Sequence, residues 1–523
     1  MNFAKVYSAH TNMLKAYIVD VEVDISEHTL NNFAIVGLPD KAIEEARDRV
    51  AAAIKNSGFK SPKSANQKVV ASLAPANEKK AGPHFDLAIA LAYLLAAGCI
   101  HFNPVEKIFL GELTLDGKLR KIDGALSLTR EAKKRGFKEV YLPLENAKEG
   151  ALIHGIKIFG VTNLKEIIAH LKVENLQSQT ELAISLRLTP QTPTEIETQT
   201  DDSIAVEIDF ADVKGQETAK RGLEIAAAGG HNLAMFGPPG TGKTMLAKAF
   251  CHILPPLSFE DVLETTSIYS VAGLLKNNLV TQPPFRSPHH TASYTSLVGG
   301  GAVPKPGEVT LAHKGVLFLD EFPEFEKRAI EALRQPLEDG VINISRVKGS
   351  ASFPADFILI AALNPCPCGN YGSEKECVCA PSALMRYQRK ISGPIIDRID
   401  MWVEVANVEH RKLICRDDNL ETGALIKKRV LQARQKQSAR FVKSKTQVNS
   451  AMTAKDIEKL IILDKATQQT LQQAAAKLAL SARAYHKIIK LARTIADLEQ
   501  SDQIASQHIL EALQYRPKNL LGV

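Results

Sequence analysis

The amino-acid sequence predicts an α/β protein of several domains, built around a buried parallel sheet. The chain has 523 residues, which is too many for a single hydrophobic core. Three short apolar segments, "NLAMF", "GVLFLD" and "FILIAAL", contain almost no polar residue, as expected of strands that are covered on both faces. After residue 408 the hydrophobic pattern becomes almost wholly helical. Together these observations predict an α/β core that is followed by a helical domain.

The composition narrows the class of protein. With 45% hydrophobic and 24% charged residues, the chain reads as a soluble globular protein. A net charge of +7 is compatible with a nucleic-acid partner but does not demonstrate one. The longest apolar run, "LAIALAYLLAAGCI", is too short to cross a hydrocarbon layer of about 30 Å and predicts a buried helix. The first residues lack the order of a signal peptide, so we expect a cytoplasmic protein that does not bind membranes.

Four regions follow one another along the chain. Residues 1–172 alternate between strands and helices, for example "KAYIVDVEVDI", "DKAIEEARDRVAAAIKNSG" and "QKVVASLAPA". Residues 173–205 are rich in Thr, Gln and Pro, which predicts a mobile linker. Residues 206–405 carry the parallel-sheet pattern, and residues 406–523 carry the helical one.

A glycine-rich motif, "GPPGTGKT", lies between the strand "NLAMF" and the helix "TMLAKAFCHIL". In that position the backbone N–H groups of the loop and of the helix N-terminus cradle phosphates. Lys243 would reach the β- and γ-phosphates of ATP, and the Thr244 hydroxyl would ligate Mg²⁺. The predicted nucleotide-binding residues are Gly237, Pro238, Pro239, Gly240, Thr241, Gly242, Lys243 and Thr244.

Polar residues at the ends of two other predicted strands complete a hydrolytic site. In "GVLFLDE", Asp320 would hold the Mg²⁺ shell and Glu321 would polarise the attacking water. Asn364 ends "FILIAALN", where its amide can orient the water or sense the γ-phosphate, as sensor 1 does in AAA+ ATPases. A loop-capping asparagine is the alternative for Asn364.

Two arginines are further candidates for contact with the nucleotide. Arg398, in "GPIIDRID", would meet the γ-phosphate of a neighbouring subunit and stabilise the charge of the transition state. Arg483, or else Arg493, in "LSARAYHKIIKLARTIADL", would contact the same nucleotide from the C-terminal region. A surface ion pair is the alternative for each arginine.

Four of the seven cysteines cluster directly after Asn364, in "NPCPCGNYGSEKECVCAP". Cys366, Cys368, Cys377 and Cys379 offer four thiolates, enough for a closed tetrahedral Zn²⁺ shell with a structural role. Zinc would then pin the loop that follows Asn364. Four free thiols and an iron–sulfur cluster are the alternatives.

The chain resembles the ComM/YifB group of Mg-chelatase-like AAA+ ATPases over nearly its whole length. The most specific segments are "FRSPHHTAS", "LVGGGAVPKPGEVTLAHKGVLFLDEFPEF", "LRQPLEDG", "NPCPCGNYG" and "SARAYHKIIKLARTIADL". The resemblance implies an AAA+ P-loop ATPase core with a helical C-terminal lid, assembled as a ring, most simply a homo-hexamer. In the ComM branch it further implies a DNA helicase that promotes branch migration during natural transformation.

The N-terminal region resembles the α+β proteolytic fold of Lon protease, whose catalytic dyad is a serine and a lysine. Here the corresponding motifs read "KKAGPHFDLA" and "KIDGALSLTREA", which place His84 and Leu126 at the two positions. Because leucine cannot act as a base, the resemblance implies an inactive domain that serves as a scaffold or binds a partner. We expect His84 to be a partly buried histidine with satisfied hydrogen bonds.

Two segments inside the ATPase region are candidates for nucleic-acid contact. "VINISRVKGSASF" predicts a β-hairpin with Arg346 and Lys348 at its tip, where they would meet DNA phosphates unless they are simply solvated. The resemblance implies that this hairpin points into the pore of the ring. Residues 267–308 predict an ordered but mobile loop, in which Arg286, His289 and His290 would contact nucleic acid or a neighbouring subunit.

The function that we predict is a ring-forming, ATP-hydrolysing DNA motor. Its substrate would be single-stranded or branched DNA, and recombination proteins would be its partners. A protein-remodelling ATPase and the ATPase subunit of a metal chelatase are the alternatives. An ATP-dependent protease is disfavoured by Leu126.

Overall fold

The computed structural model describes residues 2–12, 15–27, 29, 31–38, 41–63, 66–75, 80, 82–176, 187–193, 208–275, 279–301, 305–346, 349–371, 376–408, 421–442 and 446–517. These residues form two compact units. The N-terminal unit comprises Met1–Glu197 together with Val262–Val280, and the second unit comprises Thr198–Asp261 and Thr281–Val523. No helix in the described ranges has both the length and the apolar character needed to span a bilayer.

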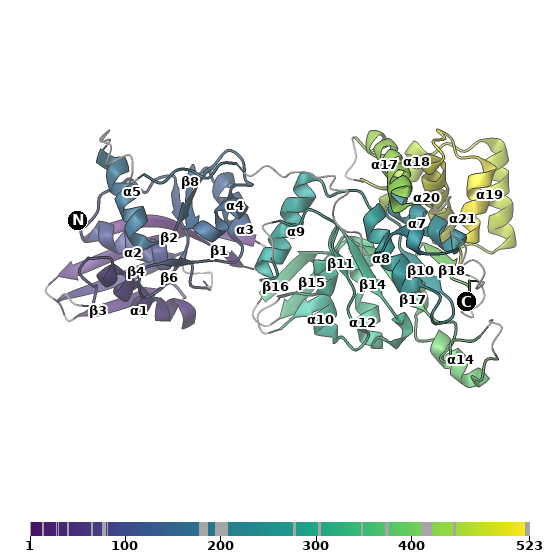
Figure 1. The fold of residues 1–523 in the computed structure, drawn as a ribbon, viewed down its shortest axis with the longest axis horizontal. Coiled ribbons are helices and arrows are strands. Elements are labelled where there is room, and N and C mark those ends of the chain that lie inside the picture. Colours follow the sequence, from purple (N-terminus) through teal and green to yellow (C-terminus); the bar gives the residue numbers. More distant parts are fainter. Residues whose placement is uncertain are drawn as a thin grey trace. The chain divides into compact units, whose positions relative to one another are not determined.

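A mixed sheet organises the N-terminal unit (Figure 1). Across this sheet the described strands are β3 (Asn32–Val36), β4 (Gln67–Ala74), β2 (Lys15–Glu27), β1 (Phe3–Asn12), β5 (Lys107–Phe109), β8 (Glu139–Pro143) and β9 (Lys157–Val161). The pairs β1–β2 and β2–β4 are antiparallel, whereas the other neighbours run parallel. A small hairpin joins β6 (Glu112–Leu113) to β7 (Leu119–Arg120).

Helices cover both faces of this sheet. The helical elements of the unit are α1 (Lys41–Asn56), α2 (Asp86–Ala96), α3 (Ala125–Lys134), η1 (Leu144–Asn146), α4 (Ala147–Gly150), α5 (Leu164–Leu176) and most of α9 (Phe259–Val271). Helices α1, α2 and α5 share one hydrophobic core with the sheet, and α3 and α4 share a separate one. Nearly every residue of α2 is buried, which confirms the buried helix predicted from its apolar run.

Part of the predicted linker contacts this unit. The backbone N–H of Leu188 donates to His170 Nδ1 at 3.0 Å, and that of Gln191 donates to Ile158 O at 2.7 Å. Residues 187–193 are therefore held against the N-terminal unit rather than free of it, because these two backbone groups find partners there. Residues 177–186 and 194–207 lie outside the described part of the chain.

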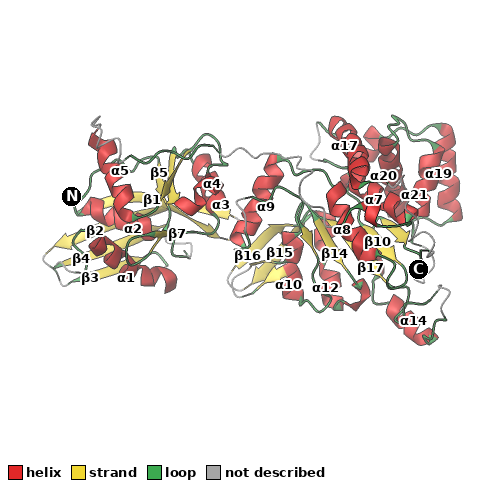
Figure 2. Cartoon of the chain, viewed as in Figure 1, coloured by secondary structure: helices red, strands yellow, loops and turns green. Residues whose placement is uncertain are grey.

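The second unit contains the parallel sheet that the apolar segments predict (Figure 2). In the order of the sheet, its described strands are β11 (Phe285–Arg286), β14 (Val316–Leu319), β17 (Ile358–Leu363), β10 (Leu233–Phe236) and β18 (Met401–Glu404). All neighbours are parallel, and every residue of β10 and β14 is buried. Because the strands are parallel, the loops after β10, β14 and β17 meet at one edge of the sheet.

The C-terminal helices share the hydrophobic core of this sheet. The helical elements of the second unit are η2 (Phe210–Asp212), α7 (Glu217–Gly229), α8 (Lys243–Ile253), α10 (Tyr294–Val298), α11 (Glu308–Leu311), η3 (Phe322–Glu324), α12 (Lys327–Ala332), α13 (Arg334–Asp339), α14 (Pro381–Gln388), α15 (Gly393–Ile396), α17 (Gly423–Arg440), η4 (Asn449–Ala451), α18 (Ala454–Leu460), α19 (Lys465–Lys477), α20 (Ala482–Leu498) and α21 (Ser506–Gln514). The predicted hairpin is confirmed, since β15 (Val341–Arg346) pairs antiparallel with β16 (Gly349–Pro354).

Residues 267–308, predicted to be a mobile loop, are more regular than expected. They contain the end of α9, the edge strand β11, the helix α10 and a small ribbon of β12 (Gly299–Gly300) and β13 (Lys305–Pro306). The prediction of a loop was wrong because these elements are too short to give a periodic hydrophobic pattern. The backbone of Val316 donates to Pro284 O at 2.7 Å, which ties β11 to the sheet.

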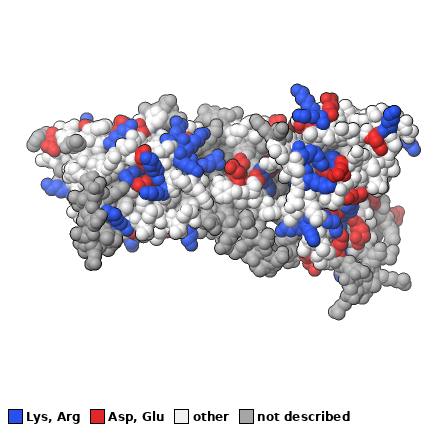
Figure 3. Space-filling view, turned by 90° about the horizontal axis from the view of Figure 1, so that it is seen from above, with Lys and Arg blue, Asp and Glu red and all other residues white. Residues whose placement is uncertain are grey.

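Charges of both signs are mixed over the surface. On the face shown in Figure 3, Lys and Arg side chains are interspersed with Asp and Glu. This agrees with the balance of 65 basic and 58 acidic residues in the sequence.

Candidate active site

The phosphate-binding motif forms the loop between β10 and α8. Gly240 and Gly242 adopt left-handed backbone conformations, with φ of +79° and +90°, that other residues rarely adopt. A Cβ at Gly237 would lie 2.0 Å from Val405 O, so only glycine fits there. The N–H of Gly237 donates to Leu363 O at 3.2 Å, which fixes the start of the loop to the end of β17. The N-terminus of α8 and this loop together form a cradle for an anion.

Lys243 links the loop to the neighbouring strand. Its Nζ donates to Gly237 O at 2.9 Å, to Pro238 O at 2.7 Å and to Asn364 Oδ1 at 3.3 Å. Burial lowers the pKa of Lys243, and the charge of Asp320 opposes that shift. All three acceptors are neutral oxygens, so a phosphate is the stronger partner for this ammonium group. The structure thus brings Lys243 and Asn364 together at the same place.

Asp320 is hydrogen-bonded to both of its predicted companions. Thr244 Oγ1 donates to Asp320 Oδ2 at 2.9 Å, and the backbone N–H of Glu321 donates to Asp320 Oδ1 at 2.9 Å. A hydroxyl and a carboxylate in contact are suitable ligands for Mg²⁺. Glu321 has a φ of +51°, a left-handed conformation that costs a residue with a side chain about 1–3 kcal/mol. Strain of this kind, directly after a strand of the sheet, is typical of a functional position.

The sequence analysis missed one residue of this site, His290. Its Nδ1 lies 3.0 Å from Glu321 Oε2, so His290 contacts the carboxylate that we expect to polarise water. This contact was not expected from the sequence, and the expected contact of His290 with nucleic acid or a neighbouring subunit stays a prediction. The reason is topological: "SPHH" follows β11, which is parallel to β14 and ends at the same edge of the sheet. The order of the strands in the sheet brings His290 to Glu321, and the spacing of these residues in the sequence does not predict the contact.

The other two candidates in that segment have local partners. Arg286 forms a two-point contact with Glu308, at 2.6 and 2.8 Å. His289 Nδ1 lies 2.8 Å from Thr291 Oγ1. The guanidinium of Arg286 therefore serves the internal structure of the segment, while His289 is exposed.

The four clustered cysteines form a group that fits a metal ion. Their Sγ atoms all lie within 4.8 Å of one another, with Cys366 at 3.3 Å from Cys368 and 3.8 Å from Cys377. A tetrahedral ion with Zn–S bonds of about 2.3 Å separates its sulfur ligands by about 3.8 Å. The N–H of Asn370 lowers the pKa of Cys368, whereas burial and the neighbouring thiols raise the pKa of Cys377 and of Cys379, so Cys368 is the first of these three to form the thiolate that a metal requires. The donor set and its spacing therefore fit a structural metal site.

The cysteine loop touches the phosphate loop. Gly369 has a φ of +81°, and a Cβ there would lie 2.6 Å from Pro239 Cδ. The backbone of this loop thus packs directly on a residue of "GPPGTGKT". Cys366 and Cys368 therefore lie between Asn364, which contacts Lys243, and Gly369, which contacts Pro239.

Comparison with known proteins assigns the family. Residues 209–413 match the family model of the magnesium chelatase subunit ChlI, residues 21–146 match subunit ChlI of Mg-chelatase, and residues 420–516 match the ChlI C-terminal model. The chain is 41% identical to YifB of Salmonella typhimurium over 519 residues, which cover 99% of the chain and 97% of the relative. It is 39% identical to the competence protein ComM of Haemophilus influenzae, over 99% of the chain and 98% of the relative. The chain belongs to the ComM/YifB family. It is a Mg-chelatase-like AAA+ ATPase of this type.

In this AAA+ ATPase, the two predicted arginines converge on one carboxylate. Arg398 pairs with Glu338 and also donates to Pro394 O at 2.8 Å and Arg334 O at 3.2 Å. Arg483 Nη1 lies 3.8 Å from the other oxygen of Glu338. Among the described residues, no hydrogen bond or ion pair joins either arginine to Lys243 or Glu321 of the same chain.

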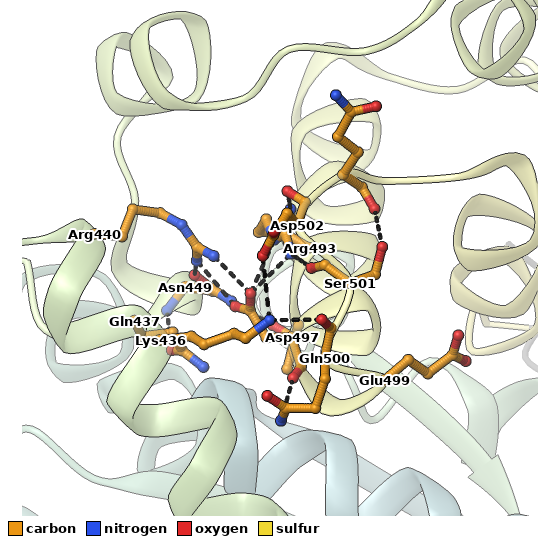
Figure 4. A network of polar contacts seen from close by, with 12 residues as sticks. Lys436, Gln437, Arg440, Asn449, Arg493, Asp497, Glu499, Gln500, Ser501 and Asp502 are labelled. Carbon is orange, nitrogen blue, oxygen red and sulfur yellow. Dashed lines mark hydrogen bonds and ion pairs between the residues drawn. The ribbon is translucent and has the colours of Figure 1, made fainter.

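Arg493, the alternative to Arg483, makes its contacts within the C-terminal helices. It is buried, lies 2.9 Å from Asp497 and donates to Ser501 O at 2.6 Å and Asp502 O at 2.8 Å. Figure 4 shows it inside a polar network of the C-terminal helices that also contains Arg440 and Asn449. Its guanidinium therefore stabilises the C-terminal helices.

The N-terminal unit of the ATPase corrects one expectation. His84 is buried, but its Nε2 finds no hydrogen-bond partner among the described residues, so it is not satisfied as expected. Burial and the nearby His10 lower the pKa of His84 to about 3, so its ring stays neutral. Leu126 is also buried, in one apolar cluster with Leu263 of α9. A side chain used for packing in this way leaves no base at that position.

The residues expected to bind DNA are only partly described. The backbone of Arg346 ends β15, in register with Gly349 of β16. Lys348 lies outside the described residues. The hairpin is present, and the role of its tip remains a prediction.

Proposed function

We propose that this ComM/YifB-family ATPase is a ring-forming DNA motor that couples ATP hydrolysis to movement along single-stranded or branched DNA. One observation carries the proposal: Arg398 and Arg483 share Glu338 and make no described contact with the phosphate loop of their own chain. Arginines placed in this way can serve the ATP of a neighbouring subunit, which requires a closed ring. One relative is a competence protein, and this favours DNA as the substrate.

Each residue of the site has a defined role in hydrolysis. Lys243 binds the β- and γ-phosphates of ATP, while Thr244 and Asp320 hold the Mg²⁺ that neutralises them. Glu321 leaves His290 and polarises the attacking water, and Asn364 orients that water or senses the γ-phosphate. The backbone of residues 237–244 surrounds the phosphates.

The ring is a homo-hexamer in this proposal. Arg398 and Arg483 release Glu338 and stabilise the charge on the γ-phosphate of the next subunit. The β15–β16 hairpins point into the central pore, where Arg346 and Lys348 grip DNA phosphates without reading the base sequence.

Zinc holds the active site in shape rather than taking part in the reaction. Cys366, Cys368, Cys377 and Cys379 would hold the ion with four thiolates, which would leave no position for a substrate. Through Gly369 and Pro239, the zinc loop would fix the phosphate loop next to Asn364.

The remaining regions support the motor. Residues 1–172 form an inactive, Lon-like α+β domain that serves as a scaffold or binds recombination proteins. Residues 173–205 are the linker, residues 206–405 the ATPase core and residues 406–523 a helical lid. We place the protein in the cytoplasm.

Strand displacement on labelled forked DNA tests the proposal, with the size of the assembly measured in parallel. The parent protein should form hexamers with ATP, hydrolyse ATP faster with single-stranded DNA and unwind the fork. Arg346→Ala/Lys348→Ala should retain ring formation and basal hydrolysis but lose unwinding. If DNA neither stimulates hydrolysis nor is unwound, the motor proposal fails, and a protein-remodelling or chelatase-type role takes its place.

A further inference from the structure

A cavity of about 350 Å³ lies in the second unit, at the edge of the sheet opposite the phosphate loop. Its floor is built from residues that lie shortly before strands: Gly230 before β10, Gly315 before β14 and Phe357 before β17. Its other wall comes from the C-terminal region, through Arg434 of α17 and residues 446–448, 450 and 451. The phosphate loop follows β10 at the opposite, carboxyl-terminal edge, so this cavity is separate from the nucleotide site.

Arg434 is the unusual group in this cavity. Its side chain is partly buried, and its Nε and Nη2 both donate to Ala227 O, at 3.2 and 2.8 Å. In the part of the chain that the structure describes, no carboxylate pairs with it. Burial lowers the pKa of this guanidinium to about 10, and the charge of Asp356 opposes the shift only in part. Asp356 compensates this charge without a hydrogen bond, and the described hydrogen bonds of Arg434 go to a single backbone carbonyl, so its other N–H donors are available to an anion that enters the cavity.

The other cation of the cavity, Lys314, is paired with two carboxylates. Lys314 Nζ lies 2.9 Å from Asp356 Oδ2 and 3.3 Å from Asp261 Oδ1. With both carboxylates in contact with Lys314, neither is available as a full partner for Arg434. The backbone of Lys314 is also strained, with a φ of +59°, as is common next to binding sites.

The walls of the cavity are held in place before any ligand arrives. Asn449 lies between the lining residues Val448 and Ser450: its backbone N–H donates to Gln437 Oε1 at 3.0 Å, and its Nδ2 donates to Asp497 Oδ2 at 2.9 Å (Figure 4). The next residue, Ser450, accepts a hydrogen bond from Lys490 Nζ at 2.9 Å. A fixed wall lowers the entropy cost of binding, which is typical of a preformed ligand site.

We propose that this cavity binds a small organic molecule through an oxyanion, either a carboxylate or a phosphate group, with Arg434 as the anchoring cation. The guanidinium offers planar donors that match two oxygens of such a group. The remaining walls, which include Pro255, Leu257 and Phe357, receive the apolar part of the molecule. Because the walls come from both the strand ends and the C-terminal helices, the bound molecule holds these two parts together. This inference stands independently of the DNA-motor proposal.

Thermal unfolding of the full-length protein tests the site. The protein is first saturated with Mg·ADP, so that added phosphate does not report on the phosphate loop. Sodium phosphate, sodium sulfate or sodium citrate is then titrated against NaCl at equal ionic strength. These salts stabilise most proteins by exclusion, so the readout is the difference between the parent and Arg434→Met. Comparing citrate with phosphate shows which oxyanion is preferred.

We expect the parent to gain about 3 °C more in Tm than Arg434→Met, and to do so in a saturable way. Lys428→Met removes an exposed charge from the same helix and should respond like the parent. Without oxyanion, Arg434→Met should be less stable than the parent, because it loses the two hydrogen bonds to Ala227 O, so each protein is compared with itself in NaCl. Arg434→Lys keeps the charge but loses the two-point contact, so it should bind at least threefold more weakly by calorimetry.

Three results would each overturn the proposal. The first is an equal response of the parent and Arg434→Met to every oxyanion. The second is a parent that gains nothing beyond NaCl. If Arg434→Met fails to fold, Arg434→Lys decides: unchanged affinity in that variant means that the guanidinium does not anchor the anion.

Discussion

Replacing His290 by alanine removes the contact that holds the Glu321 carboxylate in the structure. His290 Nδ1 lies 3.0 Å from Glu321 Oε2, and the two side chains are 31% and 51% exposed. A pair exposed to this degree is screened by solvent and is worth about 0.3–1 kcal/mol. In the proposed mechanism Glu321 gives up this contact before it polarises water, so the contact would add that amount to the barrier for hydrolysis. Removing it should raise the basal rate by about two- to fivefold.

The measurement is steady-state ATP hydrolysis at saturating ATP, together with the affinity for a fluorescent nucleotide. His290→Ala should raise kcat while nucleotide affinity stays the same, because no contact of Lys243 or Thr244 changes. His101→Ala is the control: it removes an exposed histidine of the N-terminal unit, whereas the ring of His289 packs on that of His290 with centroids 4.1 Å apart. A rate for His290→Ala that equals or falls below that of His101→Ala would refute the view that His290 restrains Glu321.

Three further predictions follow from the same structure. Lys243→Ala should abolish ATP binding. Glu321→Gln and Arg398→Ala should still bind ATP but hydrolyse it at least 100-fold more slowly. Full turnover by Glu321→Gln or by Arg398→Ala would remove that residue from the mechanism. Cys377→Ser should lose about one equivalent of zinc per chain, as measured by metal analysis, and unfold at a lower temperature, as measured by calorimetry. It should also hydrolyse ATP more slowly. Parent protein that contains no zinc after anaerobic purification would contradict this prediction. Burial lowers the pKa of His10 from 6.5 to about 4, so the unfolded chain takes up a proton at a higher pH than the folded chain does. The free energy of unfolding is therefore highest above pH 6.5 and falls as the pH drops toward 4. Protonation of His10 in the unfolded chain should therefore lower the free energy of unfolding by about 2 kcal/mol between pH 7 and pH 5. In chemical denaturation, His10→Phe should flatten the dependence of this free energy on pH. His154→Asn, at an exposed histidine, should leave it unchanged.

Local patterns in the sequence were enough to predict many elements of the second unit. The phosphate loop, the strands before Asp320 and Asn364 and the β15–β16 hairpin were predicted from short segments. Their signals are local because a buried strand must be apolar and a phosphate loop needs glycine at particular positions. The short elements between residues 267 and 308 were not predicted, since two- to five-residue segments have no measurable period.

By itself, the sequence determined which residues are chemically able to bind phosphate, magnesium and a metal ion, and the order of the elements that carry them. The tertiary structure alone decided which groups from distant segments meet. It placed His290 on Glu321, Gly369 on Pro239, and Arg398 and Arg483 on Glu338. It also placed the partly buried Arg434 on the carbonyl of Ala227, beside the cavity at the far edge of the sheet. These contacts depend on strand order and on how the C-terminal helices share the core, and both are set by the packing of buried faces across the whole unit rather than by any local pattern.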